Sequence, residues 1–586
     1  RGWTGDGGHA AETLMLNFGM GGPYAKWLDD VDDASCASHH VPNIAPGNFH
    51  GQAHGDCFGG NDPGWGAGFI DVMNWHHRYV GDRSILARHY PAAVGYMSFL
   101  NEYVARSNSS NGLLSMANYG QFTALGDWCA PSGNALAPDG GHHLSNIIVG
   151  YFWIRQLEAM ARASRVLGNV SAASGYTAQA SEARTSFGRL YFDTQQGLFR
   201  DPDWVEAWGP KVMQTEQALA ITLCLDLQDG YGDGSVAPAE IVPKADVARA
   251  AAALAASVSS GLDAGMVGIK HVFSALAATG HGDVALAALT RRTYPSYGYM
   301  LENGEGTLWE RWEGGPCDLV HASRNHIMLG SPGQFLFQQV AGIDVGPGGV
   351  AFDLVAVAPM TAAAASYSGL GGVDATVGTP RGAVTVSWRS VPNEPDLCGE
   401  AAEKNDQGQP LHLDCGANSS ISAIDFASYG TPNGTCADSS LLKVDPTCTA
   451  PTSVTVVRAA CLGKEQCTLF ANDTQFGGID PCHGIAKRLA VTVTCSNTCR
   501  PHFTLNVTVP TGSNATVSLP FTPTRVKSMS AELPVVLTES GIPIYRNGTF
   551  LPGVAAGVTA VRGKSSSIEV TTGGGHYALA LLQCTV

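Results

Sequence analysis

The chain has 586 residues, of which 44% are hydrophobic and 14% are charged, and its formal net charge at pH 7 is −16. Roughly three or four domains are expected, because one hydrophobic core does not normally serve so long a chain. No uninterrupted apolar stretch reaches the ~18 residues of a membrane span. The acidic balance argues against a nucleic-acid partner, which requires clustered Lys and Arg, and favours neutral ligands.

The first 345 residues predict a helical domain. Apolar residues recur at helical spacing in segments that include 144–167, 172–192, 214–227 and 244–258. Turn-rich connections separate about ten such segments, and no strand ladder is expected among them. We therefore predict helical hairpins packed around a common axis. The alternative, an α-solenoid, requires a repeat of fixed period, and none occurs.

After Gly346 the apolar residues alternate with a period of two, as in 383–388, 503–509, 515–521 and 566–572. This pattern predicts a C-terminal antiparallel β-sandwich built from 346–393 and 500–586. Residues 394–499 interrupt it, and eight of the 15 cysteines of the chain lie within 398–495. Such density predicts a compact disulfide-rich domain inserted into the sandwich.

Eight N-x-[Ser/Thr] sequons accompany the cysteines. They predict a glycosylated protein of the secretory pathway, located outside the cell or at its surface. The sequons are at Asn108, Asn169, Asn418, Asn433, Asn472, Asn506, Asn514 and Asn547. Because the chain does not open on a signal peptide, this interpretation implies that an N-terminal portion was removed or lies on another chain.

Aromatic and acidic residues gather in the loops between the predicted helices. The loops read "GWTGD" (2–6), "DPGWGAG" (62–68), "GDW" (126–128), "YPSYGYMLENGEGTLWERW" (294–312) and "SRNH" (323–326). Indole faces beside carboxylates suit a sugar, whose C–H faces stack on aromatic rings while its hydroxyls form hydrogen bonds. Each loop alone also fits a packing corner or a helix cap. Together they predict a carbohydrate site.

In order and spacing these loops, with "KWLDDVDDA" (26–34) and "NHIMLGSPGQFLFQQVAGI" (325–343), resemble the α-L-rhamnosidases of glycoside hydrolase family 78. The resemblance implies a six-hairpin (α/α)6 barrel over 1–345, here without its first helices. It also implies inverting hydrolysis of terminal α-L-rhamnosyl residues with no metal ion or cofactor. Inversion requires two carboxyl groups ~6.5–9.5 Å apart, one to activate water and one to protonate the leaving oxygen.

Carried over position by position, the resemblance makes Glu310 the general base. The residues that it implies as holding the sugar are Trp3, Asp6, Trp65, Asp127, Trp128, Trp309 and His326. The family's general acid is a Glu two positions before Arg1. We therefore expect the isolated chain to be inactive, and the preceding part of the precursor to be retained as an associated chain.

The inserted block carries "FASYGTPNGTC" (426–436), "CLGKEQC" (461–467), "DPCHG" (480–484) and "KRLAVTVTC" (487–495). An eight-cysteine block can be a disulfide scaffold without a ligand. This order of motifs, however, resembles the rhamnose- or galactose-binding lectin domain of the sea-urchin-egg type, which also occurs in plant-type β-galactosidases. The resemblance implies sugar contacts at Glu400, Tyr429, Asp480 and Lys487.

The same resemblance implies four disulfides in the block: Cys398–Cys436, Cys415–Cys495, Cys448–Cys482 and Cys461–Cys467. Two further pairs are expected from position alone. Cys499 and Cys584 bracket the returning strands of the sandwich, and Cys36 and Cys57 flank a Gly-rich loop.

Two functions from different classes follow. The first is a secreted α-L-rhamnosidase with an embedded lectin domain that supplies a second contact to the carbohydrate. The second is a non-catalytic glycan-binding or extracellular-matrix component that keeps the fold. Ala67 favours the second, since the family usually has Asp there, whereas the intact "WERW" and His326 favour the first. The residue two positions before Arg1 would discriminate between them.

Overall fold

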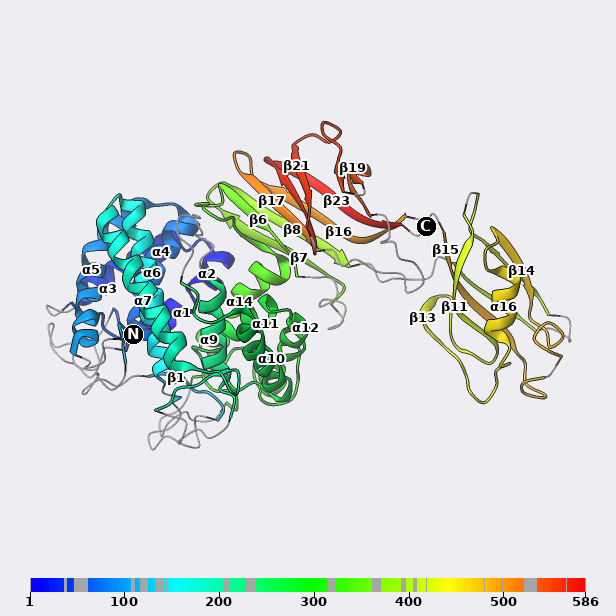
Figure 1. Ribbon diagram of the computed structural model, residues 1–586, viewed down its shortest axis with the longest axis horizontal. Coiled ribbons are helices and arrows are strands. Elements are labelled where there is room, and N and C mark those ends of the chain that lie inside the picture. Colours follow the sequence, from blue (N-terminus) through cyan, green and yellow to red (C-terminus); the bar gives the residue numbers. More distant parts are fainter. Residues whose placement is uncertain are drawn as a thin grey trace.

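The computed structural model describes most of the chain. The described residues are 2–35, 39–46, 62–106, 111–115, 125–132, 142–143, 145–203, 211–227, 239–314, 323–360, 370–390, 397–403, 408–417, 419–478, 480–496, 499–520, 535–546, 548–564 and 566–584. They form a largely helical region up to about residue 341 and two β-rich regions after it (Figure 1).

The helical region contains the predicted helices and several shorter ones. Its α-helices are α1 (Thr4–His9), α2 (Ala11–Asn17), α3 (Gly21–Ala34), α4 (Pro63–Val80), α5 (Arg83–Arg106), α6 (Asn146–Leu167), α7 (Val170–Tyr191), α9 (Gln214–Leu225), α10 (Lys244–Ser260), α11 (Ile269–Ala278), α12 (Gly282–Leu289), α13 (Tyr297–Asn303) and α14 (Gly333–Phe335). A π-helical turn, η4 (Leu336–Ala341), continues α14. Four of these helices match the predicted segments to within about two residues.

Capping residues set the limits of the longest inner helices. The Asp62 side chain accepts hydrogen bonds from the backbone N–H groups of Gly64 and Trp65 at 2.7 and 3.1 Å, and α4 ends at Gly81 with φ of 86°. Ser145 caps α6 in the same way, and Gly168 ends it at φ of 84°. Only glycine adopts such an angle without strain, so these positions stop the helices.

Burial separates two sets of helices. Helices α4, α6, α9 and α11 are buried along most of their lengths, whereas α7 and α10 bury only one face. A helix that is apolar all round lies inside, and a helix with one apolar stripe lies outside. The inner helices contact one another in the order α1, α4, α6, α9, α11.

Helix α14 completes this series. Phe335 on α14 packs against Phe273 on α11, with ring centroids 5.8 Å apart. On its other side the Gln334 backbone N–H donates to Thr13 Oγ1 on α2 at 2.9 Å. Two short ladders that the sequence did not predict also occur here: β1 (Asp127–Trp128) with β2 (His142–His143), and β3 (Phe192–Asp193) with β4 (Leu198–Phe199).

Two sheets follow the helical region, and their apolar side chains belong to the same core as the helices. One has seven strands in the order β20-β19-β18-β23-β16-β8-β7, and the other has five in the order β21-β22-β17-β6-β5. Their bounds are β5 (Ile343–Val345), β6 (Leu354–Val357), β7 (Gly372–Thr379), β8 (Gly382–Ser390), β16 (Cys499–Val509), β17 (Asn514–Pro520), β18 (Val535–Glu539), β19 (Ile542–Arg546), β20 (Thr549–Phe550), β21 (Val558–Gly563), β22 (Ser567–Thr572) and β23 (Gly575–Cys584).

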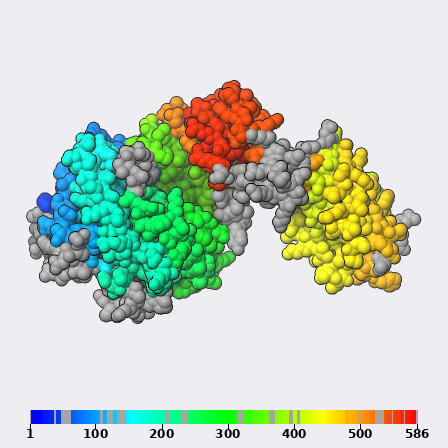
Figure 2. Space-filling model, in the orientation of Figure 1, coloured from blue at the N-terminus to red at the C-terminus, as the bar shows by residue number. Residues whose placement is uncertain are grey.

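The inserted domain leaves the larger sheet after β8 and returns at β16. These two strands are antiparallel neighbours, with Val386 opposite Val507, so the insertion is accommodated at one point on the sheet. Its elements are β9 (Leu397–Ala402), β10 (Pro410–Asp414), β11 (Ile421–Gly430), β12 (Asn433–Thr435), β13 (Asp438–Lys443), α16 (Ser453–Cys461), β14 (Gln466–Phe470) and β15 (Arg488–Cys495). It has a hydrophobic core of its own and is drawn as a separate body in Figures 1 and 2.

All four disulfides implied for the insert are present in the structure: Cys398–Cys436, Cys415–Cys495, Cys448–Cys482 and Cys461–Cys467. The backbones of Cys499 and Cys584 are directly opposite each other between β16 and β23. The side chains of this pair lie outside the described residues, as do Cys36 and Cys57. Cys129 is disulfide-bonded as well, and Cys224 is a free thiol whose pKa burial raises to about 12.

Among the sequons that fall on described residues, four asparagines are exposed and Asn472 is half-buried. The exposed ones are Asn169, Asn433, Asn506 and Asn514. Asn108, Asn418 and Asn547 lie outside the described residues. Within the described part of the chain, the helices are too short or too polar to span a membrane.

Candidate functional site

The predicted general base lies on an extended segment that pairs with the "SRNH" loop. The Glu310 backbone N–H donates to the carbonyl of Ser323 at 2.8 Å, and the His326 N–H donates to the carbonyl of Leu308 at 2.9 Å. These two backbone bonds bring Glu310 and His326, which the sequence separates by a turn-rich loop, into one site.

Both carboxylate oxygens of Glu310 have a fixed donor. The Trp128 indole N–H donates to Oε1 at 3.1 Å, and the Ser323 backbone N–H donates to Oε2 at 2.8 Å. Each oxygen keeps a lone pair for another hydrogen bond. The two donors orient the carboxylate, as a base that removes a proton from water requires.

Asp6 meets the same site from α1. Its Oδ1 lies 3.1 Å from His326 Nε2, with about a fifth of the Asp6 side chain exposed. Burial raises the pKa of Asp6 from 3.8 to about 6; the charge of His326 opposes this rise and that of Glu310 adds to it. Asp6 is therefore close enough to Glu310 for the two charges to interact. His326 Nδ1 is buried and has no hydrogen-bond partner among the described residues.

The predicted tryptophans of the site differ in how far they are buried. Trp3 precedes α1, is half-buried and bridges to Ile44. Trp65 and Trp309 are only 3% and 2% exposed. A Cβ on Gly5 would lie 2.5 Å from the Trp65 ring, so glycine is required where α1 meets this indole.

Trp309 lies beneath a cation, since the Arg324 guanidinium is 5.0 Å from its ring centroid. The indole nitrogens of Trp65 and Trp309 are buried without a partner among the described residues. Both rings are therefore packed inside the protein, whereas the Trp128 ring is partly exposed to solvent.

Asp127 differs from the expectation that it holds the sugar. It is fully buried, and its carboxylate accepts backbone hydrogen bonds from Gly265 at 2.7 Å, Val267 at 3.0 Å and Gly268 at 2.9 Å. The Thr215 hydroxyl is a fourth donor. Burial raises the pKa of Asp127, and these hydrogen bonds oppose the rise. A carboxylate has about four acceptor sites, and the four donors fill them, so none is left for a sugar hydroxyl.

A buried ion pair behind the site was not predicted. The Lys270 ammonium lies 3.0 Å from Glu12 Oε2, and both side chains are nearly inaccessible to solvent. Lys270 also donates to Gln334 Oε1 at 2.7 Å and to the carbonyl of His9, at the end of α1, at 3.3 Å. The pair thus joins α11, α2 and α14 to the helix that carries Asp6. A lone Lys in an apolar helix has no sequence signature that names its distant partner.

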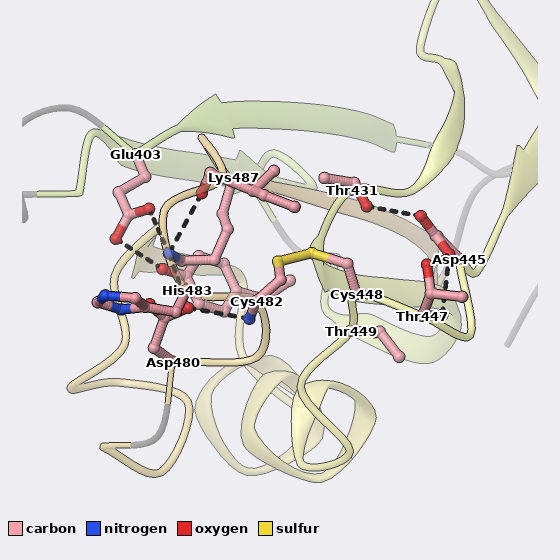
Figure 3. The surroundings of a disulfide bond; sticks show 12 residues. Glu403, Thr431, Asp445, Thr447, Cys448, Thr449, Asp480, Cys482, His483 and Lys487 are labelled. Atoms are coloured by element: carbon pink, nitrogen blue, oxygen red, sulfur yellow. Dashed lines mark hydrogen bonds and ion pairs between the residues drawn. A yellow bond between two sulfur atoms is a disulfide. The ribbon is translucent and has the colours of Figure 1, made fainter.

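The inserted domain has a second polar cluster, around Lys487. Its ammonium, 5% exposed, lies 3.0 Å from both Glu403 Oε2 and Asp480 Oδ1. The Tyr429 hydroxyl donates to Glu403 at 3.1 Å and to Asp473 at 3.0 Å. Figure 3 shows Glu403, Asp480 and Lys487 pointing toward one another beside the Cys448–Cys482 disulfide.

Three of the four predicted lectin residues therefore belong to one cluster, and Glu400 does not. Glu400 Oε1 pairs instead with Arg488 Nη1 at 3.0 Å and accepts the Cys436 N–H at 2.6 Å. Residues three apart along an extended chain point to opposite faces, as do neighbours such as Lys487 and Arg488. Glu403, which the sequence analysis missed, takes the place expected for Glu400. The sequence did hold a signal for this difference, because two glutamates three residues apart on a strand cannot point to the same face.

Comparison with known proteins identifies the two domains that hold these clusters. A family model for the bacterial α-L-rhamnosidase six-hairpin glycosidase domain matches residues 1–340, and a D-galactoside/L-rhamnose-binding SUEL lectin model matches 413–495. An α-L-rhamnosidase from Streptomyces avermitilis is 28% identical over 429 residues, which are 70% of this chain and 36% of that protein. One from Formosa agariphila is 24% identical, over 70% of this chain and 41% of its own length. The chain thus spans well under half of these relatives.

The insert has relatives of another kind: β-galactosidase 13 of Arabidopsis thaliana is 40% identical over 102 residues, 16% of this chain and 12% of that protein.

Among solved structures, an α-L-rhamnosidase from Dictyoglumus thermophilum has a TM-score of 0.62 at 18% identity, covering 99% of this chain and 46% of that chain. The S. avermitilis enzyme complexed with L-rhamnose has a TM-score of 0.59 at 19% identity, covering 99% and 38%. Because the matched domain makes up more than half of it, the chain belongs to the bacterial α-L-rhamnosidase six-hairpin glycosidase family, with a SUEL lectin domain inserted.

Proposed function

We propose that the protein containing this chain is an α-L-rhamnosidase that hydrolyses terminal α-L-rhamnosyl residues with inversion, and that Glu310 is its general base. The supporting observation is the Glu310 carboxylate, oriented by Trp128 and Ser323 and sharing a site with Asp6 and His326. Glu310 removes a proton from a water molecule as that water attacks the anomeric carbon. In the family pattern the carboxylic acid that protonates the leaving oxygen precedes Trp3.

We interpret the series of inner helices from α1 to α14, with its outer layer, as the (α/α)6 barrel, and the two sheets as a β-sandwich. In this arrangement Asp6 on α1 meets Trp128, Glu310 and His326, which the connecting segments carry to one end of the inner helices. Asp6 and His326 accept and donate hydrogen bonds to the sugar hydroxyls, and the face of Trp128 packs against the ring.

The lectin domain supplies a second contact to the carbohydrate in this proposal. Lys487 donates hydrogen bonds, while Glu403 and Asp480 accept them, so the cluster can bind adjacent sugar hydroxyls. A tethered second contact raises the effective concentration of substrate at the catalytic site. Four disulfides and exposed sequons support a location outside the cell.

The test is hydrolysis of an aryl α-L-rhamnoside by the protein isolated from its natural source and by a recombinant Glu310→Gln variant of the same polypeptides. We expect the variant to lose several orders of magnitude in kcat with an unchanged fold, because Gln cannot accept the proton of water. Glu302→Gln, an exposed glutamate paired with Arg292, is the matched control. NMR of the first product should show the inverted anomer. More than about a tenth of the activity remaining in Glu310→Gln would remove it from this role.

The second candidate function is a non-catalytic glycan-binding component, which the fully buried Ala67 favours because the family usually has Asp at that place. The same assay separates the two. A native protein that binds rhamnosides and hydrolyses none would support the binding function.

A further inference from the structure

We propose that Asp127 is a positioning residue for the general base, acting through the indole of Trp128. The inference rests on the proposed role of Glu310 and adds to it a residue that has no contact with substrate. Its basis is a series of hydrogen bonds. They connect the buried Asp127 carboxylate to the turn that carries Trp128, and the Trp128 indole to the Glu310 carboxylate.

The first link is the attachment of Asp127 to the loop before α11. Three backbone donors from one short segment, those of Gly265, Val267 and Gly268, lie within 3.0 Å of its carboxylate. A Cβ on Gly265 would lie 2.3 Å from the carbonyl oxygen of Trp128, so only glycine allows this approach. Asp127 therefore fixes its own backbone to a packed element, as a buried charge with all acceptor sites filled does.

The second link is the backbone of Trp128. The Met266 N–H donates to the Trp128 carbonyl at 2.9 Å, and Trp128 pairs with His142 across the β1–β2 ladder. Gly126 and Cys129, on either side, both have φ of 59°, which makes this turn tight. The main chain that carries the indole is thus held on both sides by the contacts that Asp127 organises.

The third link is the indole itself. With its backbone fixed, Trp128 aims its N–H at Glu310 Oε1 at 3.1 Å, while Ser323 holds the other oxygen. A carboxylate held by two donors presents its remaining lone pairs in fixed directions. Loss of the Trp128 donor would leave Ser323 alone to orient the base.

Asp127→Asn tests the first link with little change in volume. An Asn Nδ2 at the place of Oδ2 would face the Gly265 N–H with another donor, which breaks that bond. We expect kcat to fall by about tenfold to a hundredfold, because the base is no longer held in one orientation. KM should change less than about threefold, because the sugar-holding groups remain. Trp128→Phe should lower kcat equally, and the double variant no further.

The matched control is Asp201→Asn. Asp201 is also buried, and it accepts the Asn146 backbone N–H at 2.5 Å at the start of α6. Its loss should lower stability without lowering the kcat of the folded protein. A merely structural role for Asp127 would make the two variants alike. If a folded Asp127→Asn protein keeps wild-type kcat, the proposal is wrong.

A second readout does not require turnover. In protein labelled with 15N at the tryptophan indoles, the Trp128 resonance, identified by its absence in Trp128→Phe, should shift in Glu310→Gln, because the acceptor of its hydrogen bond changes. In Asp127→Asn it should move toward the solvent-exposed position. If the wild-type protein hydrolyses no rhamnoside yet shows both shifts, the proposed function fails while the positioning holds. An indole signal in Asp127→Asn identical to that of the wild type would overturn the positioning.

Discussion

His326 Nε2 lies 3.1 Å from Asp6 Oδ1, which joins the first helix of the described chain to the loop that follows the general base. Burial is the main reason that the pKa of Asp6 is raised to about 6. Above this pH the Asp6 carboxylate is ionised, pairs with His326 and accepts hydrogen bonds from a sugar. Below it the carboxyl is protonated, and both interactions weaken.

We therefore predict that KM for an aryl α-L-rhamnoside rises as the pH falls through about 6. Steady-state kinetics between pH 4.5 and 8 provide the measurement, with KM and kcat analysed separately because the base affects kcat. Asp6→Asn should have a raised KM that no longer follows pH in this range. A KM of the wild type that stays level from pH 7 to pH 5 would contradict the assignment of Asp6 to sugar binding.

A second prediction concerns the lectin domain, where the two glutamates lie on opposite faces. Glu403→Gln should weaken binding of L-rhamnose or D-galactose by about tenfold or more, because Glu403 contacts both Lys487 and the Tyr429 hydroxyl. Glu400→Gln should retain binding, since Glu400 pairs with Arg488. Calorimetry with the Glu310→Gln chain, which cannot consume a rhamnoside, measures both. Loss of binding only in Glu400→Gln would restore the sequence-based assignment.

The main helices and strands could be predicted because each has a local signal, and the four lectin disulfides because the block resembles a known family. Periodicity identifies a helix or strand, and glycines such as Gly81 and Gly168 mark helix ends. The motif order implied the cysteine pairs. The two short ladders gave no signal, since two-residue strands such as β1 are too short to show a period.

The structure brings together Trp128 with Glu310 and Asp6 with His326, while the role of each residue stays a prediction. Asp127 and Trp128 are neighbours in the chain, yet the carboxylate is buried in the wall while the indole reaches Glu310. Side-chain direction in a tight turn depends on backbone angles that residue types do not fix. The hydrogen bond from the Ser323 backbone to Glu310 could not be predicted from the sequence for another reason. A backbone N–H donor is present at every residue except proline, so no residue type marks it.

A third prediction tests the buried pair behind the site. Lys270→Met should destabilise the helical region by about 3–5 kcal/mol, because it leaves Glu12 buried without its cation. Adding Glu12→Gln should recover part of this loss, since neither charge is then unpaired. Thermal unfolding followed by circular dichroism measures each variant. Lys26→Met, which removes an exposed pair with Asp30, is the control and should leave the transition unchanged. Additive losses in the double variant would refute direct coupling of the pair.

The last prediction concerns Glu216, a buried glutamate on α9. Burial, aided by the charge of Asp201, raises its pKa from 4.5 to about 8, although a Ser145 hydrogen bond opposes the rise. Below about pH 4.5 the folded and unfolded chains both hold this proton. Between about 4.5 and 8 the unfolded chain releases it while the folded chain keeps it, so Glu216 lowers the free energy of unfolding progressively as the pH rises. Each unit of such a shift corresponds to about 1.4 kcal/mol.

Glu216→Gln cannot ionise and should remove this penalty. We expect the melting temperature of the variant, relative to wild type, to increase steadily from pH 5 to pH 8 in differential scanning calorimetry. Because other groups titrate in both proteins, the difference between the two melting curves isolates Glu216. The exposed Glu182→Gln is the control and should show no pH-dependent difference. A Glu216→Gln difference that is constant across this range would mean that Glu216 is already ionised in the folded protein.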